Sequence, residues 1–520
     1  MSKDAILLRR WLAPALLLGY FVFLFTGLHA VPRGLIERDG YFHARYAQML
    51  PQRGLSRKFP WTQASPWKHR FADKEFLFHV LLSPFARGAE PIRGALVFSV
   101  LLSAGVFAAF YFFLAANGAR APGLFTFFLA CMGGPFLLRM SFLRAHVLSV
   151  VLLLIGLHFL LRGRWKELFG LGFVYAWSYS FPFVLPLLAL PYLAGKRLAG
   201  GKFEWKCLAA AAGGVLAGLV IHPYTPYSLD SAATYFDILG IAAGRRSFAA
   251  VEVGREFAPY STRSFLLSFP MLTMVLGGLG LAGWATKRKL SAESMGLLCA
   301  AGAAALTTMI YMRAIEYAAP LTAAALAFAL RDTLDKPAID RLKDLLKRKP
   351  RRIWIVATLV AALLGAAHIQ GLVYSYGMSA RSEPPRFKQA AVWMAANMIE
   401  GETMVNLWWD DFPDLFYHGH RQTYVVGLDP AYLLRHNRQT ALRLEGMRLG
   451  RLPLDAEWLA ETFAARYMVL RTAYARFYPQ LMTREWRPVY RDEYAAVYAL
   501  KGPAGPPAHL RGLPQIPALR

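Results

Sequence analysis

Five ionisable side chains crowd into nine positions near the N-terminus. In GLIERDGYFHARYAQML (34–50), directly after a first apolar stretch, they are Glu37, Arg38, Asp39, His43 and Arg45. Carboxylates in such a place can bind a divalent cation through oxygen ligands or take a proton from an acceptor as a general base. Cations beside them can bind phosphate groups. The alternative is an ordinary helix start, with Asp39 as the cap and Arg45 reaching lipid headgroups.

Two further segments place charges at the ends of apolar blocks. Glu256 lies in VEVGREFAPYSTRSF (251–265), and YMRAIEYAAP (311–320) carries Arg313 and Glu316. A charge at a membrane span costs about 2.5–3.5 kcal/mol on insertion scales, so Arg313 and Glu316 tend to face a cavity. The alternatives are a surface glutamate at 256 and an intrahelical ion pair between 313 and 316.

A third segment, LLRMSFLRAHVLSV (137–150), carries Arg139, Arg144 and His146. A histidine can ligate a transition metal. Two arginines beside it would repel a metal ion but would attract phosphate.

The composition indicates the elements that must position these residues. Of 520 residues 56% are apolar and 18% are charged, whereas soluble domains carry about 25% charged residues. The apolar residues cluster in blocks near the length that crosses a bilayer, about 20 residues. The net charge of +27 gathers at block ends, around 162–166, 196–206, 287–289 and 331–352. This is the pattern of positively charged cytoplasmic loops, and it disfavours nucleic-acid binding as the reason for the basic charge. The three cysteines lie inside apolar blocks, so no disulfide framework is expected.

We therefore predict a polytopic α-helical membrane protein of about eleven spans. An uncleaved first span puts the N-terminus in the cytoplasm and the C-terminus outside, with every basic cluster on the cytoplasmic side. Pro182 and Pro186 interrupt 167–195 and leave one hairpin more or fewer open. The spans are predicted near 11–30, 92–116, 121–138, 146–161, 167–180, 182–195, 207–221, 265–286, 291–311, 315–330 and 353–374.

Three segments are expected outside the membrane: the loops 31–91 and 222–264, and the chain from 376. In the last segment we predict helices over 386–398 and 455–464 and strands over 403–407, 423–427 and 466–470. The expected division is a transmembrane domain over 1–375, a small periplasmic α/β domain over 376–500, and a disordered Pro/Gly-rich tail over 501–520.

Several motifs resemble a known family in the same order. Asp39-Gly40-Tyr41-Phe42-His43-Ala44-Arg45 is similar to the first acidic motif of the oligosaccharyltransferase catalytic subunit, a member of the GT-C superfamily. These membrane glycosyltransferases use polyprenyl-phosphate-linked sugars. The segment 73–78 (DKEFLF) resembles the region before the second span in lipid A and protein O-mannosyl members. Trp408, Trp409 and Asp410 resemble the Trp-Trp-Asp motif that holds the hydroxyl of an acceptor sequon, although Asp411-Phe412 replaces the Tyr-Gly that follows it.

The resemblance implies a GT-C-like fold in a bacterial-style inner membrane. The implied enzyme moves a sugar or glycan from a polyprenyl-phosphate-linked donor to a lipid, glycan or protein acceptor on the periplasmic face. It implies Asp39, Glu37 and Glu256 as catalytic residues, Arg313, Arg144, Arg139 and His43 at the donor phosphate, and Trp408, Trp409 and Asp410 at the acceptor. A divalent metal, Mg or Mn, would be held by Asp39, Glu256 and His146.

The family's second acidic pair, expected between the third and fourth spans, is absent from 137–150. Either the metal site is built differently, or catalysis depends on a base together with cations that hold the donor. Two other functions stay open: an oligosaccharyltransferase acting on protein Asn, and a transporter or flippase for a lipid-linked glycan. The absence of an internal repeat and the charges at span ends favour the enzyme over the transporter. A non-catalytic membrane scaffold is a further alternative.

Overall fold

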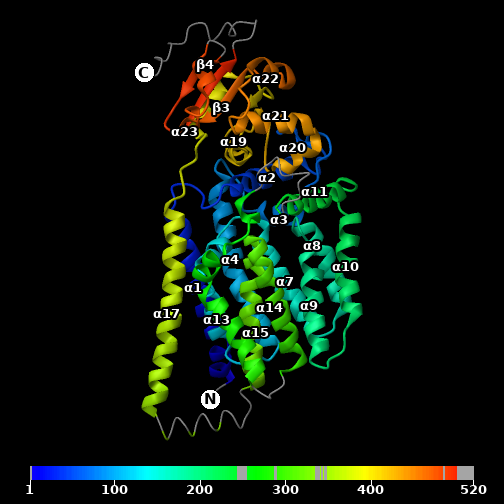
Figure 1. Cartoon of the computed structure of the whole chain (residues 1–520), viewed down its shortest axis with the longest axis vertical. Helices are drawn as coiled ribbons and strands as arrows, with labels where there is room; N and C mark the ends of the chain where they lie inside the picture. The colour runs from blue at the N-terminus through cyan, green and yellow to red at the C-terminus, as the bar shows by residue number, and fades with distance from the viewer. Residues whose placement is uncertain are drawn as a thin grey trace.

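The computed structural model is a bundle of helices with a small sheet at one end (Figure 1). It describes residues 3–242, 254–285, 290–333, 350–483 and 486–500, and single residues at 340, 344 and 348. The predicted disordered tail over 501–520 lies outside the described residues. The N-terminal helix and the sheet lie at opposite ends of the molecule (Figure 1).

Most predicted spans coincide with single helices, because long runs rich in Leu and Ala favour continuous helix, even though three of these helices contain Pro14, Pro191 or Pro320. Four of the described helices are long and apolar enough to cross a membrane: α1, α4, α14 and α17, with up to six spans if each of two bent pairs counts as one. The figure of eleven spans therefore stays a prediction. The helices at predicted spans are α1 (Lys3–Ala30), α4 (Pro91–Ala116), α7 (Ala145–Leu161), α8 (Trp165–Ser178), α9 (Val184–Leu198), α10 (Trp205–Val220), α14 (Ala292–Ile310), α15 (Ile315–Thr333) and α17 (Pro350–Ala380).

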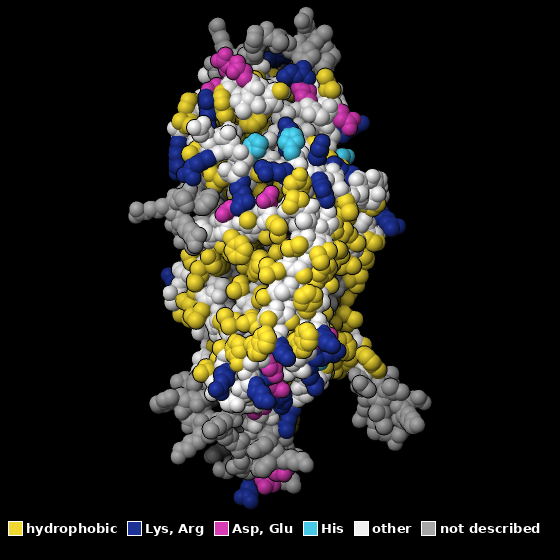
Figure 2. All heavy atoms as spheres, turned by 90° about the vertical axis from the view of Figure 1, so that its right-hand side faces the viewer, with side chains coloured by type: hydrophobic (Ala, Val, Ile, Leu, Met, Phe, Trp, Pro, Cys, Tyr) yellow, Lys and Arg dark blue, Asp and Glu magenta, His cyan; other side chains and the backbone are white. Residues whose placement is uncertain are grey.

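A belt of hydrophobic side chains surrounds the middle of the bundle in the face that Figure 2 shows. On the opposite side of the bundle, α17 also exposes apolar residues: Trp354, Leu359 and Val373 are 64–70% exposed (Figure 1). This surface fits the hydrocarbon layer of a bilayer, where apolar side chains need no burial within the protein.

Two predicted spans, 121–138 and 265–286, are not single straight helices. The first is divided into α5 (Pro122–Ala130) and α6 (Gly134–Met140), bent by 98°. The second is divided into α12 (Thr262–Ser268) and α13 (Pro270–Ala285), bent by 94°. Pro270 removes a backbone donor and disfavours helical geometry at the residue before it.

The two bends contact each other through Gly133. Its φ of +144° lies in a region that residues with a Cβ rarely adopt. A Cβ there would lie 2.6 Å from the carbonyl oxygen of Ser268. The bend turns α6 so that Arg139, near its end, joins the charged residues described below.

The loop after α1 folds into α2 (Asp39–Arg53), a short 3-10 turn (Pro66–Lys68) and α3 (Phe76–Leu82). Gly40 lets the first turn of α2 approach the segment between α6 and α7, since a Cβ would lie 3.2 Å from the Cβ of Leu143. This close approach brings Asp39 next to Arg144.

The C-terminal region contains a five-stranded sheet in the order β2-β1-β3-β5-β4. Strand β1 pairs in parallel with β2 and β3, whereas β5 pairs antiparallel with β3 and β4. The three predicted strands and both predicted helices are present, but the last two strands were not expected. The elements are α18 (Lys388–Asn397), β1 (Thr403–Val405), α19 (Phe412–His418), β2 (Thr423–Tyr424), α20 (Pro430–His436), α21 (Arg438–Arg448), α22 (Ala456–Phe463), β3 (Tyr467–Arg471), β4 (Trp486–Arg491) and β5 (Ala495–Leu500).

The loop after α1 packs directly on this sheet. Beside β2, the Gln63 N–H donates to the Tyr424 carbonyl at 2.7 Å, and the Tyr424 N–H donates to the Trp61 carbonyl at 2.8 Å. Phe59 packs against Phe416, with ring centroids 5.6 Å apart. One aromatic core is therefore shared by the first loop and the C-terminal region, and the division at 375/376 stays a prediction.

Candidate active site

A cavity of 430 Å³ lies where the first loop, the helix ends and the C-terminal region meet. Six segments far apart in the chain contribute charged groups to its wall, so the cavity exists only in the folded chain. The charged and imidazole side chains on this wall are Glu37, Arg38, Asp39, His43, Lys74, Glu75, Arg144, Glu256, Arg313, Asp410 and Asp429.

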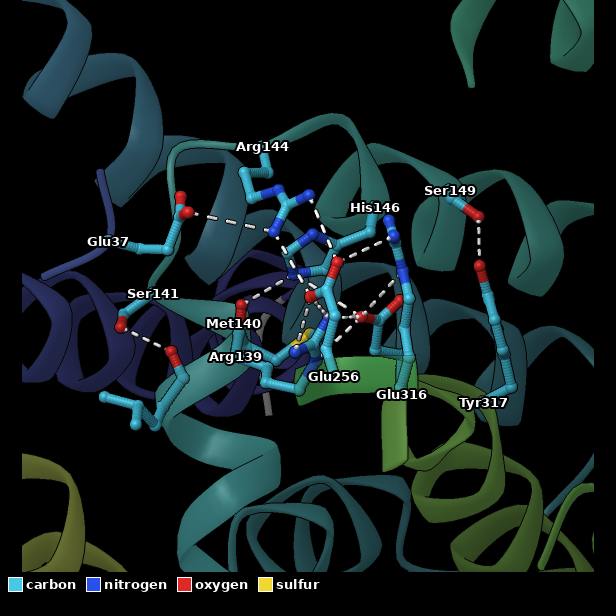
Figure 3. Close-up of polar contacts among 12 residues, drawn as sticks. Glu37, Arg139, Met140, Ser141, Arg144, His146, Ser149, Glu256, Glu316 and Tyr317 are labelled. Atoms are coloured by element: carbon cyan, nitrogen blue, oxygen red, sulfur yellow. Dashed lines mark hydrogen bonds and ion pairs between the residues drawn. The ribbon is translucent and has the colours of Figure 1, made fainter. Parts of the chain in front are cut away.

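Glu256, in the 3-10 turn η2 (Arg255–Phe257), bonds to three guanidinium groups, of which Figure 3 labels those of Arg139 and Arg144. Arg139 Nη1 and Arg144 Nη1 each lie 3.2 Å from its Oε2, and Arg313 Nη1 lies 3.1 Å from its Oε1. Burial opposes ionisation, but the three guanidinium groups outweigh it and hold the pKa of Glu256 well below its usual range. The cavity therefore contains a strongly cationic position that an ionised carboxylate occupies.

Asp39 and Glu37 lie on the other side of Arg144. Arg144 Nη2 lies 3.1 Å from Asp39 Oδ2, and Arg144 Nη1 lies 3.8 Å from Glu37 Oε1. The Asp39 N–H also donates to Glu37 Oε1 at 3.0 Å. Burial, and then the nearby charge of Asp39, raises the pKa of Glu37 to about 8. Burial also raises the pKa of Asp39. Carboxyl groups with raised pKa values can exchange a proton near neutral pH, as a general base must.

Arg139 and His146 lie deeper, beside Glu316. Arg139 Nε donates to Glu316 Oε1 at 2.7 Å, and His146 Nε2 lies 2.8 Å from the Arg139 carbonyl oxygen (Figure 3). The side chain of His146 is fully buried. Arg139 thus reaches the cavity only through Glu256, and His146 lines no part of it.

The residues present do not fit a metal ion held jointly by Asp39, Glu256 and His146. The guanidinium of Arg144 bonds to both Asp39 and Glu256, at 3.1 and 3.2 Å, where a shared cation would have to lie. Within the described ranges, the three ligand atoms that do gather within 4.8 Å of one another belong to His43, Glu75 and His79.

The predicted acceptor residues are divided between two places. Trp409 and Asp410 line the cavity. Trp408 lies against the C-terminal region instead, with its ring centroid 4.5 Å from that of Tyr474. Asp410 forms an ion pair with Arg471 of β3. Arg471 also forms an ion pair with Asp411, at 2.5 Å.

Four charged wall residues were not predicted as site residues: Arg38, Lys74, Glu75 and Asp429. Arg38 Nη1 donates to Asp414 Oδ2 at 2.8 Å. Lys74 and Glu75 belong to the segment 73–78 that resembles the family. That resemblance was the sequence feature that could have identified them as site residues. Asp429 has a local explanation, because its Oδ1 accepts the Ala431 N–H at 2.8 Å and caps α20. Burial nevertheless raises the pKa of Asp429 to about 6. A capping aspartate gives no sequence signal of a second role.

The backbone of the whole chain, compared with solved structures, is similar to membrane glycosyltransferases. The apo oligosaccharyltransferase of Archaeoglobus fulgidus superposes with a TM-score of 0.62 at 14% identity, covering 91% of this chain and 73% of that one. ArnT from Cupriavidus metallidurans gives a TM-score of 0.53 at 14% identity, covering 96% of this chain and 99% of that one. The chain has the GT-C fold.

A second Archaeoglobus fulgidus structure, AglB with an inhibitory peptide and a dolichol-phosphate, matches the same GT-C fold. It gives a TM-score of 0.60 at 15% identity and covers 90% of this chain and 70% of that one. No protein-family model matches the sequence, and no curated protein sequence does. The fold likeness is thus visible in the backbone arrangement and not in overall sequence similarity.

Proposed function

We propose that the protein is a GT-C-type glycosyltransferase that moves a sugar or glycan from a polyprenyl-phosphate-linked donor to an external acceptor. The observation that carries the proposal is one cavity in which Asp39 and Glu37 face Arg144, and Arg144 and Arg313 both bond to Glu256. Carboxylates for proton transfer and cations for phosphate then lie in the same cavity. Two of the similar structures hold a polyprenyl phosphate: AglB holds dolichol-phosphate and ArnT holds undecaprenyl phosphate.

In the proposed reaction, the acceptor nucleophile attacks the anomeric carbon and gives its proton to the Asp39 carboxylate. The bond between the anomeric carbon and the phosphate oxygen breaks, and the lipid phosphate leaves with the electron pair. Negative charge grows on that phosphate in the transition state, so the fixed guanidinium groups of Arg144 and Arg313 stabilise it more than the ground state.

In this proposal the Glu256 carboxylate occupies the place of the donor phosphate when no donor is bound. This carboxylate takes the three guanidinium groups that a phosphate would need, so the donor phosphate must compete with it or bind beside it. Each arginine keeps a second carboxylate when Glu256 moves: Asp39 for Arg144, and Glu316 for Arg139 and Arg313. The cation cluster would therefore stay in place.

We propose that the sheet end faces the periplasm and that the membrane is the cell inner membrane, with the N-terminus in the cytoplasm. Support comes from the basic residues on the opposite end, where Lys and Arg gather below the hydrophobic belt (Figure 2). Arg162, Arg164 and Lys166 are exposed at the turn between α7 and α8, and Arg197 is exposed at the end of α9. Basic residues prefer cytoplasmic loops.

A transfer assay in detergent tests the proposal. The full chain is incubated with polyprenyl-phosphate-linked sugars that carry a radiolabel in the sugar, together with an extract of membrane lipids and glycans. Movement of the label from the donor lipid to another molecule supports transfer, and Arg144→Ala should abolish it while Arg435→Gln, outside the cavity, should not. Label that stays on the donor lipid with every sugar tested overturns the proposal, and movement of the intact lipid across a vesicle membrane would favour a flippase.

A second candidate is an oligosaccharyltransferase acting on Asn in proteins. Trp409 and Asp410 line the cavity, and a solved Archaeoglobus fulgidus structure with the same fold holds a peptide containing the NVT sequon. Binding of a peptide with an Asn-x-Ser/Thr sequence, lost in Trp409→Ala, would favour this candidate. The position of Trp408 away from the cavity weighs against it.

A further inference from the structure

A second group of polar residues lies on the wall of the cavity, on α2 and around the start of α3. His43, Glu75 and His79 place one ligand atom each within 4.8 Å of the other two. All three side chains are buried, with exposed fractions of 5%, 8% and 1%. The sequence suggested none of these residues as a metal ligand.

Asp73 orients the group. Its two carboxylate oxygens both lie 2.9 Å from His79 Nδ1, and the Asp73 side chain is itself buried. A proton on Nδ1 leaves the lone pair of His79 on Nε2, which lies 2.9 Å from His43 Nδ1. A carboxylate that holds one nitrogen of a histidine so that the other can bind is the usual arrangement behind a metal-ligating histidine.

The three ligands come from two helices held together by aromatic packing. Glu75 is at the N-cap position of α3, where its side chain makes no capping bond, and His79 lies one turn later, so both face the same side, towards His43 on α2. The rings of Phe78 and Tyr46 lie 5.3 Å from His43 and 4.9 Å from His79 respectively. This surrounding fixes the imidazole rings and keeps bulk water away.

The Glu75 carboxylate is buried beside the two imidazole rings. Its Oε2 lies 3.8 Å from His43 Nδ1, and the charge of the neighbouring Lys74 also acts on it. A buried carboxylate is normally paired or bound to a cation. Without a metal ion, Asp73, His79 and His43 form a chain of short contacts of 2.9 Å, and among the described residues Glu75 has only the 3.8 Å contact with His43 and the charge of Lys74.

We propose that His43, Glu75 and His79 bind a divalent transition metal, with zinc as the best fit. Two imidazole nitrogens and one carboxylate oxygen are a ligand set typical of zinc sites that keep an open fourth position. Binding at about 2.0–2.1 Å from each nitrogen requires the two nitrogens to separate slightly beyond a hydrogen-bond distance. His43 and Glu75 both line the cavity, so the open position faces it.

The metal would act as a positioning element for α2. His43 follows Asp39 by one helical turn, on the same face. A metal that joins His43 to Glu75 and His79 would fix the first turn of α2 against α3 and hold Asp39 in the cavity. This inference does not depend on the proposed glycosyl transfer, because metal binding can be measured without donor or acceptor.

Metal content of the purified full chain tests the inference. The protein is treated with a chelator, dialysed, titrated with zinc in detergent and analysed by mass spectrometry of the metal. We expect about one zinc per chain in the wild type and in His368→Gln, a control that removes a buried imidazole of α17. We expect less than a tenth of that in His79→Ala and Glu75→Ala. Wild-type protein without bound zinc, or variants that keep it, would overturn the inference.

Asp73→Asn covers the case in which the ligand variants do not fold. It keeps the shape of the side chain and removes only its charge, so the zinc Kd should rise about 10–100-fold, as for other residues that orient a ligand. Cobalt substitution adds a spectroscopic readout: the visible bands of tetrahedral Co²⁺ should appear in the wild type and shift in His79→Cys. An unchanged Kd in Asp73→Asn, together with no such bands in the wild type, would contradict the site.

Discussion

Replacing Asp39 with asparagine tests the proposed base in the cavity. The substitution keeps the size of the side chain at the start of α2 and removes its charge, which lies 3.1 Å from Arg144. Loss of a general base typically slows a reaction about 10²–10⁴-fold, or about 3–5 kcal/mol in the barrier. The effect on folding should be much smaller, because Arg144 keeps Glu256 at 3.2 Å and Glu37 at 3.8 Å. We therefore expect transfer to fall at least 100-fold, with a change in unfolding free energy of about 1 kcal/mol or less.

The assay pairs radiolabel transfer with binding of undecaprenyl phosphate and a thermal unfolding curve for each variant. Asp237→Asn is the matched control, because Asp237 is also ion-paired and partly buried, at 2.6 Å from Arg435, but does not line the cavity. Its transfer rate should stay within twofold of the wild type. Binding of undecaprenyl phosphate should be equal or tighter in Asp39→Asn, since a negative charge near the phosphate is gone.

Two results would refute the reasoning. If Asp39→Asn transfers sugar at more than a tenth of the wild-type rate, Asp39 is not the base. If transfer falls but the unfolding temperature and lipid binding fall with it, as they would not in Asp237→Asn, then Asp39 supports the fold and not the chemistry.

Arg313→Gln should weaken binding of undecaprenyl phosphate about 10-fold or more, because a hydrogen bond to a charged group contributes about 1.5–3 kcal/mol; a change below threefold in equilibrium binding would contradict a role at the phosphate. The pKa of Glu37 is raised to about 8 by burial and by Asp39, so the folded chain loses stability as pH rises from about 4.5 through 8. Thermal unfolding from pH 5 to pH 8 should therefore show the wild type falling relative to Glu37→Gln, and parallel curves would refute the raised pKa. Arg471→Met should lower the free energy of unfolding by about 1.5–3 kcal/mol, because it removes the short bond of 2.5 Å to the buried Asp411 and leaves it, among the described residues, only Arg386, at 3.6 Å. Adding Asp411→Asn should restore part of that loss in denaturant unfolding, and no recovery would mean that the pair is not what stabilises the region.

The sequence alone was sufficient for the elements that depend on local patterns. Apolar runs of span length predicted most of the helices, and short apolar runs between polar segments predicted β1, β2 and β3. Strands β4 and β5 were missed for local reasons: β4 contains Pro488 and partly exposed side chains, and β5 is rich in alanine, which does not favour strands. Their pairing with β3 supplied what their own residues did not indicate.

The sequence indicates that the chain can break at Gly133 and before Pro270, but it does not predict the bends themselves. A proline or glycine inside an apolar run marks a break, but it does not give the angle of the turn or what the bend contacts. The 98° and 94° turns depend on two bends that support each other through Gly133 and Ser268. Neighbours that far apart in sequence leave no local signal.

Types and spacing of residues pointed to Asp39, Glu37 and Arg313, because charge beside a membrane span is costly unless it faces a cavity. The resemblance to a known family in motif order added Glu256 and the roles of all these residues. Only the tertiary structure decided how they lie. Arg144 bonds to Asp39 and Glu256, which are 217 positions apart in the chain, and it takes the place of the metal that motif order had implied. The same packing moved His146 away from the cavity and gathered His43, Glu75 and His79 instead. Ion pairs and metal ligands depend on atoms meeting within a few ångströms, and long-range packing of helices sets those distances.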